Sequence, residues 1–111
     1  MSVDEKYEFV LIYCVFPNHE IAEKIARIIL DAKLAACVNI FPPMTSLYEW
    51  EGKLETIHET AAIIKTRRNL AEKVIKTARP LHPHAVPCFL ILPIASGNPE
   101  FLGWVRDQTV V

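Results

Sequence analysis

The sequence predicts an α+β fold in which the elements follow one another as β-α-β-β-α-β, with a short helix at the C-terminal end. Three observations lead to this prediction. Apolar runs at residues 7–16 and 88–94 are typical of strands. Two amphipathic segments between these runs are typical of helices. Between the two helices, residues 34–66 contain two further β-runs that meet at a glycine. We expect a single domain over residues 1–111.

The first strand and the first helix have clear boundaries. Residues 7–16 (YEFVLIYCVF) are rich in aromatic and β-branched side chains, which predicts a central strand covered on both faces. Pro17 ends this strand, and Asn18 is a good N-cap for a helix that extends to about Lys33. The apolar stripe of that helix consists of Ile21, Ile25, Ile28, Ile29 and Ala32.

The two β-runs of residues 34–66 predict a long hairpin. Its arms are residues 35–48 and 53–66, and Glu51-Gly52 forms the turn, because glycine readily adopts a positive φ. Pro42-Pro43 interrupts the first arm, since proline has no N–H for the ladder. On the second arm Glu55, His58 and Glu59 predict a solvated face.

This hairpin is too long for one small domain to cover. Each arm of about 14 residues at roughly 3.4 Å per residue gives a length of about 50 Å. A domain of this size has a radius of gyration of only about 13 to 14 Å. The overhanging end nevertheless carries apolar side chains, namely Leu47, Tyr48, Trp50 and Leu54. We therefore expect other copies of the same chain to cover it.

The second helix follows the hairpin. Asn69 and Glu72 have the spacing of a capping box, which predicts a helix over residues 70–79. Its apolar stripe is Ala71, Val74, Ile75 and Ala78. Pro80 ends the helix, and the proline-rich segment PLHPHAVP that begins there predicts an irregular loop.

The last strand and helix complete the order. Residues 88–94 (CFLILPI) predict a strand, and Pro93 places it at an edge or a bulge of the sheet. Ser96-Gly97 is a turn, and Asn98-Pro99-Glu100 has the cap, proline and acidic residue typical of a helix start. The apolar side chains of this helix are Phe101, Leu102, Trp104 and Val105.

The composition of the chain argues against nucleic-acid and membrane partners. Twelve Lys and Arg against thirteen Asp and Glu leave a net charge of −1, without the basic block that a nucleic-acid partner requires. No apolar run reaches the roughly 18 residues of a membrane span, and the acidic start of the chain is unlike a secretion signal. Three cysteines without a CxxC pair fit a reducing compartment. We therefore expect a cytoplasmic protein without nucleic-acid or membrane partners.

The predicted element order is that of the ferredoxin-like, split βαβ fold. In this fold the first strand lies antiparallel beside the fourth, which brings Cys14 near Cys88, with His82 and His84 in the adjoining loop. Thiolate and imidazole are ligands that suit Cu(I) or Zn(II). The alternative is structural, since strand cysteines are usually packing residues and His82 can simply hold the loop by hydrogen bonds.

Five strings of the sequence resemble the CutA family, the divalent-cation tolerance proteins: AACVNI, TSLYEWEGKLE, IIKT, HPHAVPCFLILPI and SGNPEFLGWV. The resemblance covers nearly the whole chain from Tyr7 onward. It implies a ferredoxin-like fold, a homotrimer built through the long hairpins, and an association with copper and other heavy metals. It implies no defined enzymatic activity.

The chain departs from the family pattern in the loop before the last strand. The family commonly has HPYxxPE where this chain has HPHAVPC, so that His84 replaces a tyrosine and Cys88 a glutamate. The resemblance implies metal coordination at Cys14 and at the position of Cys88. With His82, these residues form the predicted metal site, in which a soft sulfur replaces a hard oxygen.

The sequence also predicts that the protein is not an enzyme. It lacks the motifs GxxxxGK[ST], GxGxxG, HExxH and GxSxG, and three glycines cannot build a glycine-rich phosphate cradle. No nucleotide cofactor is expected. The similarity of the family to the PII signalling trimers implies an alternative function, in which a small effector binds between subunits near Tyr48, Trp50 and Trp104.

Overall fold

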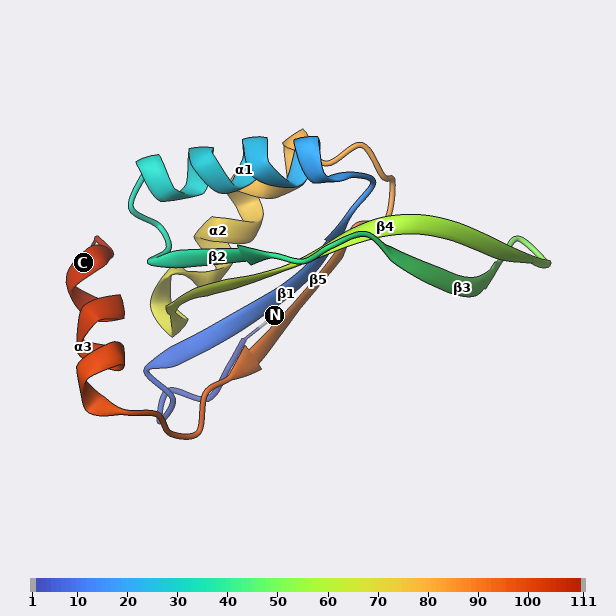
Figure 1. Ribbon diagram of the computed structural model, residues 1–111. Helices are drawn as coiled ribbons and strands as arrows, with labels where there is room; N and C mark the ends of the chain where they lie inside the picture. The colour runs from blue at the N-terminus through green and yellow to red at the C-terminus, as the bar shows by residue number, and fades with distance from the viewer. Residues whose placement is uncertain (1, 111) are drawn as a thin grey trace.

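The computed structural model of the chain describes residues 2–110 and confirms the predicted α+β order (Figure 1). Its antiparallel sheet has the strand order β2-β4-β1-β5, and β3 pairs only with the far part of β4. The strands are β1 (Phe9–Phe16), β2 (Cys37–Ile40), β3 (Met44–Trp50), β4 (Lys53–Arg67) and β5 (Cys88–Pro93). The helices are α1 (His19–Asp31), α2 (Ala71–Ala78) and α3 (Pro99–Gln108).

Helices α1 and α2 cover one face of the sheet and form the core with it (Figure 1). Buried side chains alternate with half-buried ones along most of β1, so that Val10, Ile12 and Cys14 are fully buried and Tyr13 is not. The prediction that β1 is covered on both faces is therefore wrong for the single chain. The strand is central, but α1 and α2 lie only on its first face, and on the second face α3 reaches only the start of the strand, where the Arg106 guanidinium lies over the Phe9 ring at 5.3 Å.

The boundaries of α1 follow from its caps. The Asn18 side-chain oxygen accepts a hydrogen bond from the Ile21 N–H at 2.9 Å, which confirms the predicted N-cap. At the other end Lys33 has a φ of 57°, and the Leu34 N–H donates to the Ile29 carbonyl at 3.1 Å. This left-handed residue turns the chain toward β2, two residues after the helix ends at Asp31.

The predicted capping box of α2 is wrong. A short 3₁₀ turn, Arg68–Leu70, precedes the helix, and the N-cap is Leu70, which makes no side-chain capping hydrogen bond. Asn69 lies inside the 3₁₀ turn and therefore cannot serve as the cap. Burial of Ala71, Val74, Ile75 and Ala78 on the core holds the helix in place.

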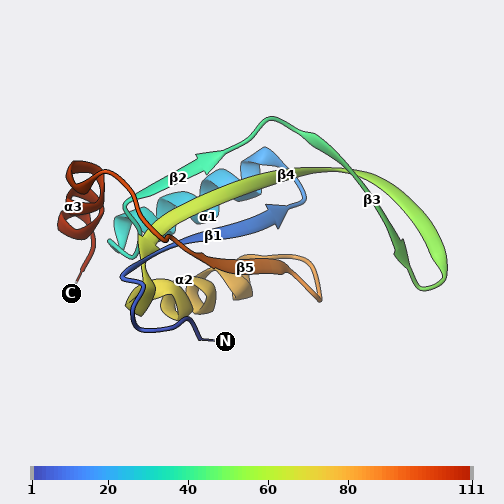
Figure 2. The same cartoon turned by 90° about the horizontal axis from the view of Figure 1, so that it is seen from below.

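The hairpin β3–β4 extends beyond the body of the molecule, as predicted (Figure 2). Its two-residue turn has Glu51 at φ 51° and Gly52 at φ 80°, with Trp50 paired to Lys53. The first arm is split into β2 and β3, and Pro42-Pro43 lies in the gap between them. The longest dimension of the molecule, 44 Å, reflects this projection.

Strand β5 lies antiparallel to β1 at the edge of the sheet, as its proline predicted. Helix α3 lies at the end of the molecule opposite the hairpin (Figure 1). There the Arg67 guanidinium donates to Thr109 Oγ1 at 2.9 Å, and the Val110 N–H donates to the Lys33 carbonyl at 2.9 Å. Within residues 2–110, none of the helices has the length and hydropathy needed to cross a membrane.

Candidate functional site

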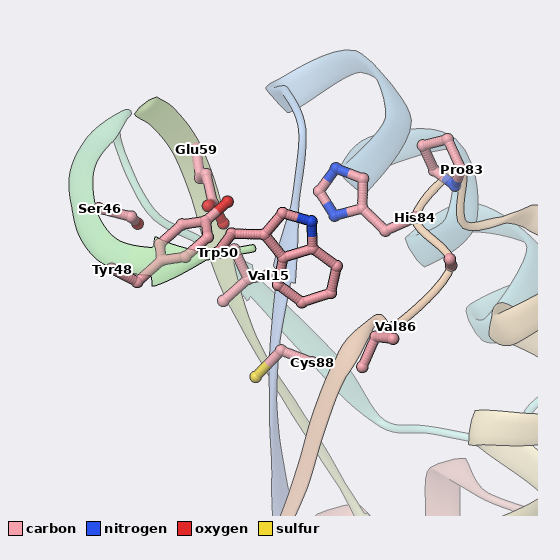
Figure 3. Close-up of a pocket in the computed structure, with 10 residues that line it drawn as sticks. Val15, Ser46, Tyr48, Trp50, Glu59, Pro83, His84, Val86 and Cys88 are labelled. Atoms are coloured by element: carbon pink, nitrogen blue, oxygen red, sulfur yellow. The ribbon is translucent and has the colours of Figure 1, made fainter. Parts of the chain in front are cut away.

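A cavity of about 630 Å³ lies where the end of β1, one face of the hairpin and the loop before β5 meet (Figure 3). Strands β1 and β5 contribute Val15 and Cys88, and the hairpin contributes Ser46, Tyr48, Trp50 and Glu59. The loop supplies residues 83–86, including His84. The volume lies in the range typical of small-molecule sites.

The register of the sheet explains why Val15, Cys88 and Glu59 face this cavity. Val15 pairs with Cys88 on one side and with Ala61 on the other, and directly paired side chains share a face. Glu59 is two residues from Ala61 on β4 and therefore has the same orientation. All of these side chains lie on the face opposite the helices.

The hairpin places its aromatic side chains on the same side as Glu59. Met44 pairs with Glu59, and Ser46, Tyr48 and Trp50 follow at the two-residue spacing that keeps a face. Leu47 and Leu54 lie on the opposite face, 66% and 75% exposed. Figure 3 shows His84 reaching from the loop toward the indole of Trp50.

Cys14 and Cys88 lie on neighbouring strands, but their side chains occupy opposite faces of the sheet. Cys14 pairs with Phe89, whereas Cys88 pairs with Val15. Because adjacent residues of a strand alternate, Cys14 points into the helix-covered core and Cys88 into the cavity. The Cys14 thiol is fully buried and contacts the Ala62 carbonyl at 3.6 Å.

His82 uses both ring nitrogens within the chain. Nε2 lies 2.6 Å from the Val15 carbonyl and Nδ1 lies 3.2 Å from the His84 N–H. A carbonyl accepts and an N–H donates, so these contacts require the neutral tautomer with its proton on Nε2. His82 is 6% exposed, and its ring stacks on Phe16 at 5.3 Å between centroids. These bonds fit the structural alternative for His82.

The predicted metal ligands are thus separated in the single chain. Cys14 is in the core, His82 is engaged in hydrogen bonds, and Cys88 lines the cavity with His84. Within residues 2–110, no three or more His, Cys, Asp or Glu side chains are grouped in a way that could hold a metal ion. A metal site that uses Cys14, His82 and Cys88 together therefore stays a prediction.

Burial and charge act on the two thiols to different degrees. Burial raises the pKa of Cys14 to about 12, with a smaller contribution from the nearby Cys88. Burial also raises the pKa of Cys88, and the negative charge of Glu59 adds to that shift. Cys88 is only half-buried and borders an open cavity, so it is the more accessible of the two.

The sequence-based interpretation missed Glu59 as a cavity residue. It assigned Glu55, His58 and Glu59 to one solvated face, which is wrong because neighbouring residues 58 and 59 point in opposite directions. Glu59 is 8% exposed, whereas His58 lies on the other side and contacts Thr45 at 3.5 Å. The alternation from Glu59 through Ala61 to Ile63 is the signal that identifies its orientation.

Trp104 lies far from the other two predicted cleft residues. It belongs to α3, where its ring packs against Phe101 at 5.6 Å between centroids. Tyr48 and Trp50 are on β3, at the opposite end of the molecule (Figure 1). A cleft that contains all three aromatic side chains would require a second copy of the chain.

These observations define a ferredoxin-like α+β protein with an extended hairpin and a cavity along one face of that hairpin. Residues 10–108 match the family described as "CutA1 divalent ion tolerance protein". The chain therefore belongs to the CutA1 family, as the five strings of its sequence predicted.

Individual relatives agree with this assignment. The divalent-cation tolerance protein CutA of Archaeoglobus fulgidus is 46% identical over 99 residues, which cover 89% of this chain and 95% of that protein. The mouse protein CutA is 42% identical over 93 residues, which cover 84% of this chain and only 52% of the mouse protein. The chain thus spans about half the length of that curated relative.

Solved structures show the same fold. CutA1 from Shewanella sp. SIB1 has a TM-score of 0.92 at 32% identity and covers 95% of this chain and 98% of its own. The periplasmic divalent cation tolerance protein CutA from Archaeoglobus fulgidus has a TM-score of 0.87 at 42% identity, covering 90% and 97% of the two chains. These values confirm the predicted ferredoxin-like architecture with its projecting hairpin.

Proposed function

We propose that the protein is a cytoplasmic homotrimer that contributes to the tolerance of copper and other divalent heavy-metal ions. In this proposal it acts by binding metal, weakly or at a soft Cys/His site, and carries out no catalytic step. Membership of the CutA1 family supports the metal role. The three free cysteines support a reducing compartment.

The observation that carries the metal proposal is the presence of Cys88 and His84 in one cavity. A thiolate and an imidazole are the donors that Cu(I) prefers, and both side chains border the same open space. Cys88 must lose its proton to bind metal, so its raised pKa makes binding dependent on pH. Cys14, in contrast, is closed off in the core.

A Cu(I) titration against a competing chelator tests this proposal. We expect tight binding near one ion per chain for the wild type. We expect the binding to be lost in Cys88→Ser and reduced in His84→Ala, since each substitution removes one donor from the cavity. The readout is the stoichiometry and the competition constant at neutral pH.

Cys14→Ala is the matched control for this titration, because it removes a neighbouring thiol from the other face of the sheet. The proposed cavity site predicts unchanged copper binding in this variant. If binding is lost in Cys14→Ala and retained in Cys88→Ser, the site is not in the cavity. Weak binding that is indifferent to both substitutions contradicts a cysteine site altogether.

The trimer is supported by surfaces that one chain leaves uncovered. The hairpin projects from the body, and its distal part exposes Leu47, Trp50 and Leu54 by 50% or more. On the face of the sheet opposite the helices, Leu90 and Leu92 are also 56% and 46% exposed. Other copies of the chain carry the same apolar surfaces and would cover them in a symmetric assembly.

Sedimentation equilibrium tests the trimer directly. We expect three times the chain mass of 12.6 kDa at micromolar concentration. Trp50→Glu should weaken the assembly, because the interface would then bury a charge without a partner. A wild-type protein that sediments as a monomer at this concentration would refute the proposal.

A second candidate function is an effector-binding trimer in which metal binding is incidental. The cavity favours it, because Tyr48 and Trp50 form an aromatic wall beside about 630 Å³ of open space. In this case a small ligand would still bind, with measurable heat, to a Cys88→Ser variant. The metal proposal predicts instead that the variant loses its specific ligand.

A further inference from the structure

The cavity contains a buried carboxylate without a partner. Glu59 is 8% exposed and lines the cavity, and within residues 2–110 its side chain makes no hydrogen bond or ion pair. None of its oxygens is completely sealed from solvent, so the carboxylate opens into the cavity. Burial of such a group is costly unless a partner of opposite charge or a donor compensates it.

The other lining residues fit an organic cation. Among residues 2–110, no lysine or arginine borders the cavity, and Glu59 is the only carboxylate that does. On the neighbouring hairpin positions, Lys53 pairs with Trp50 and Glu55 with Tyr48, so these two opposite charges offset each other. The local charge that faces a ligand is therefore that of Glu59.

The aromatic side chains supply the second element of cation recognition. Tyr48 and Trp50 lie on the hairpin face that carries Glu59, and their rings border the same space (Figure 3). A cation over the face of tryptophan or tyrosine is attracted by the ring, most strongly when its hydration is weak. Val15 and Val86 complete an apolar wall that suits methyl groups.

We propose that this cavity binds a small organic ammonium ion, whose charge pairs with Glu59 and whose methyl groups pack on Trp50 and Tyr48. A hydrated inorganic divalent ion fits less well, because hard cations need several oxygen ligands and the cavity supplies one carboxylate. The inference rests on the effector-binding candidate function and names the class of its ligand. All of the residues involved belong to one chain. Because Tyr48 and Trp50 also belong to the hairpin that we propose other copies contact, the test below uses the assembled protein.

Three probes of one shape and different charge test the proposal: choline, 3,3-dimethyl-1-butanol and 3,3-dimethylbutyrate. The chain has two tryptophans, so a Trp104→Phe background makes Trp50 the only indole reporter. We expect saturable changes in Trp50 fluorescence with choline, and binding at least about tenfold weaker with the neutral alcohol or the anion. Ionic strength is held constant with NaCl, and EDTA removes divalent metal.

Two variants make the test specific to Glu59. Glu59→Gln preserves the shape and removes the charge, and we expect choline binding to weaken at least about tenfold. Glu49→Gln is the matched control on the opposite face of the same hairpin, away from the cavity, and should change binding by less than about twofold. Far-UV circular dichroism and sedimentation show that both variants retain the fold and assembly.

Each remaining outcome overturns the proposal. Equal binding of choline and its neutral analogue, or unchanged binding in Glu59→Gln, would show that charge is not recognised. Preferred binding of the anion would refute the ammonium ligand while leaving an effector site in place. No binding of any probe, with the fold intact, would show that the cavity is closed to these ligands, for example by a side chain of another copy. The copper titration is read separately and is unaffected by these results.

Discussion

The two faces of the same sheet differ sharply in what covers them. On the helix-covered face Val10, Ile12 and Ile64 are no more than 1% exposed, because α1 and α2 pack directly against them. On the other face Leu90 and Leu92 are about half exposed. The first face is a closed core, whereas the second is buried at Phe9 and Ala61 but exposes apolar side chains at Leu90 and Leu92 in the single chain.

This difference gives neighbouring cysteines different chemistry. Cys14 and Cys88 lie on adjacent strands in almost the same row, yet one is sealed in the core and the other borders the cavity. Side-chain alternation along a strand decides between these outcomes, and a one-residue change of register would exchange them. Proximity of two strands is therefore not sufficient evidence for a shared ligand site.

Two adjacent isoleucines on β4 provide the most sensitive test of the difference between the helix-covered face and the open face. Ile64 is 1% exposed on the helix-covered face, and Ile63 is half-buried on the open face. We expect Ile64→Ala to lower the free energy of unfolding by about 3 to 4 kcal/mol, since it leaves a cavity in a packed core. Ile63→Ala should cost less than about 2 kcal/mol in the dissociated chain. Urea unfolding measures both.

Sedimentation of the same two variants controls for assembly. The contrast between the two faces is contradicted if Ile63→Ala lowers the free energy of unfolding as much as Ile64→Ala does in a chain that sediments as a monomer. Equal costs in a trimer would have a different meaning, because they would place the open face at the contact between subunits. Unfolding and sedimentation together therefore show whether another subunit covers the open face.

Most of the fold could be predicted from local signals. Asn18 caps α1, Glu51-Gly52 forms the two-residue turn, and Pro42-Pro43 separates β2 from β3, as the residue types indicated. Each of these features depends on a few neighbouring residues. The Asn69 cap failed because the preceding strand continues to Arg67 and a 3₁₀ turn follows it, and this depends on tertiary packing.

The site was harder to predict because it depends on pairing between distant residues. The sequence placed Cys14 near Cys88 correctly, but only the register shows that Val15, and not Cys14, is the partner of Cys88. His82 has the residue type of a ligand, and its hydrogen bonds to the Val15 carbonyl and the His84 N–H appear only in three dimensions. The same is true of Glu59, which the pairing of β3 with β4 brings to the cavity beside Tyr48 and Trp50.

The Cys14 thiol provides a second test of how well the helices bury the first face, and its expected effect on stability is smaller. Burial raises its pKa from 9.0 to about 12, so between these values the unfolded chain loses a proton that the folded chain retains. This contribution to stability is complete below pH 9 and is lost as the pH rises toward 12. The free energy of unfolding should fall by up to about 1.4 kcal/mol per pH unit, or about 2 kcal/mol by pH 10.5.

Cys14→Ala isolates this effect from other groups that titrate at alkaline pH. Its unfolding free energy at pH 7 gives the cost of the lost packing, and the difference from wild type should shrink as the pH rises from 9 to 10.5. Chemical denaturation at each pH measures it. A difference that stays constant over this range would show that the Cys14 thiol is not protected by the core.

The smallest effect on stability is expected for an exposed ion pair between Glu8, just before β1, and Arg106 on α3. The Glu8 carboxylate pairs with the Arg106 guanidinium at 2.8 Å and 3.0 Å, which lowers the pKa of Glu8 below its ordinary value of 4.5. Both side chains are about half exposed, so water and salt screen most of the attraction. Unlike the core thiol, this group stabilises the fold above pH 4.5, and its contribution is lost as the pH falls through its lower folded pKa.

Glu8→Gln should therefore reduce the melting temperature only slightly at pH 7, and the reduction should disappear in acid and at high salt. Glu5→Gln is the matched control, since it removes the same charge from an exposed residue three positions earlier. Thermal melts of the two variants from pH 2 to pH 7 measure the difference in their melting temperatures. This range spans the titration of carboxylates, which occurs at roughly pH 4. A large loss of stability that persists in acid would mean that the Glu8 stem packs against the body, so that α3 is held by burial and not by the ion pair.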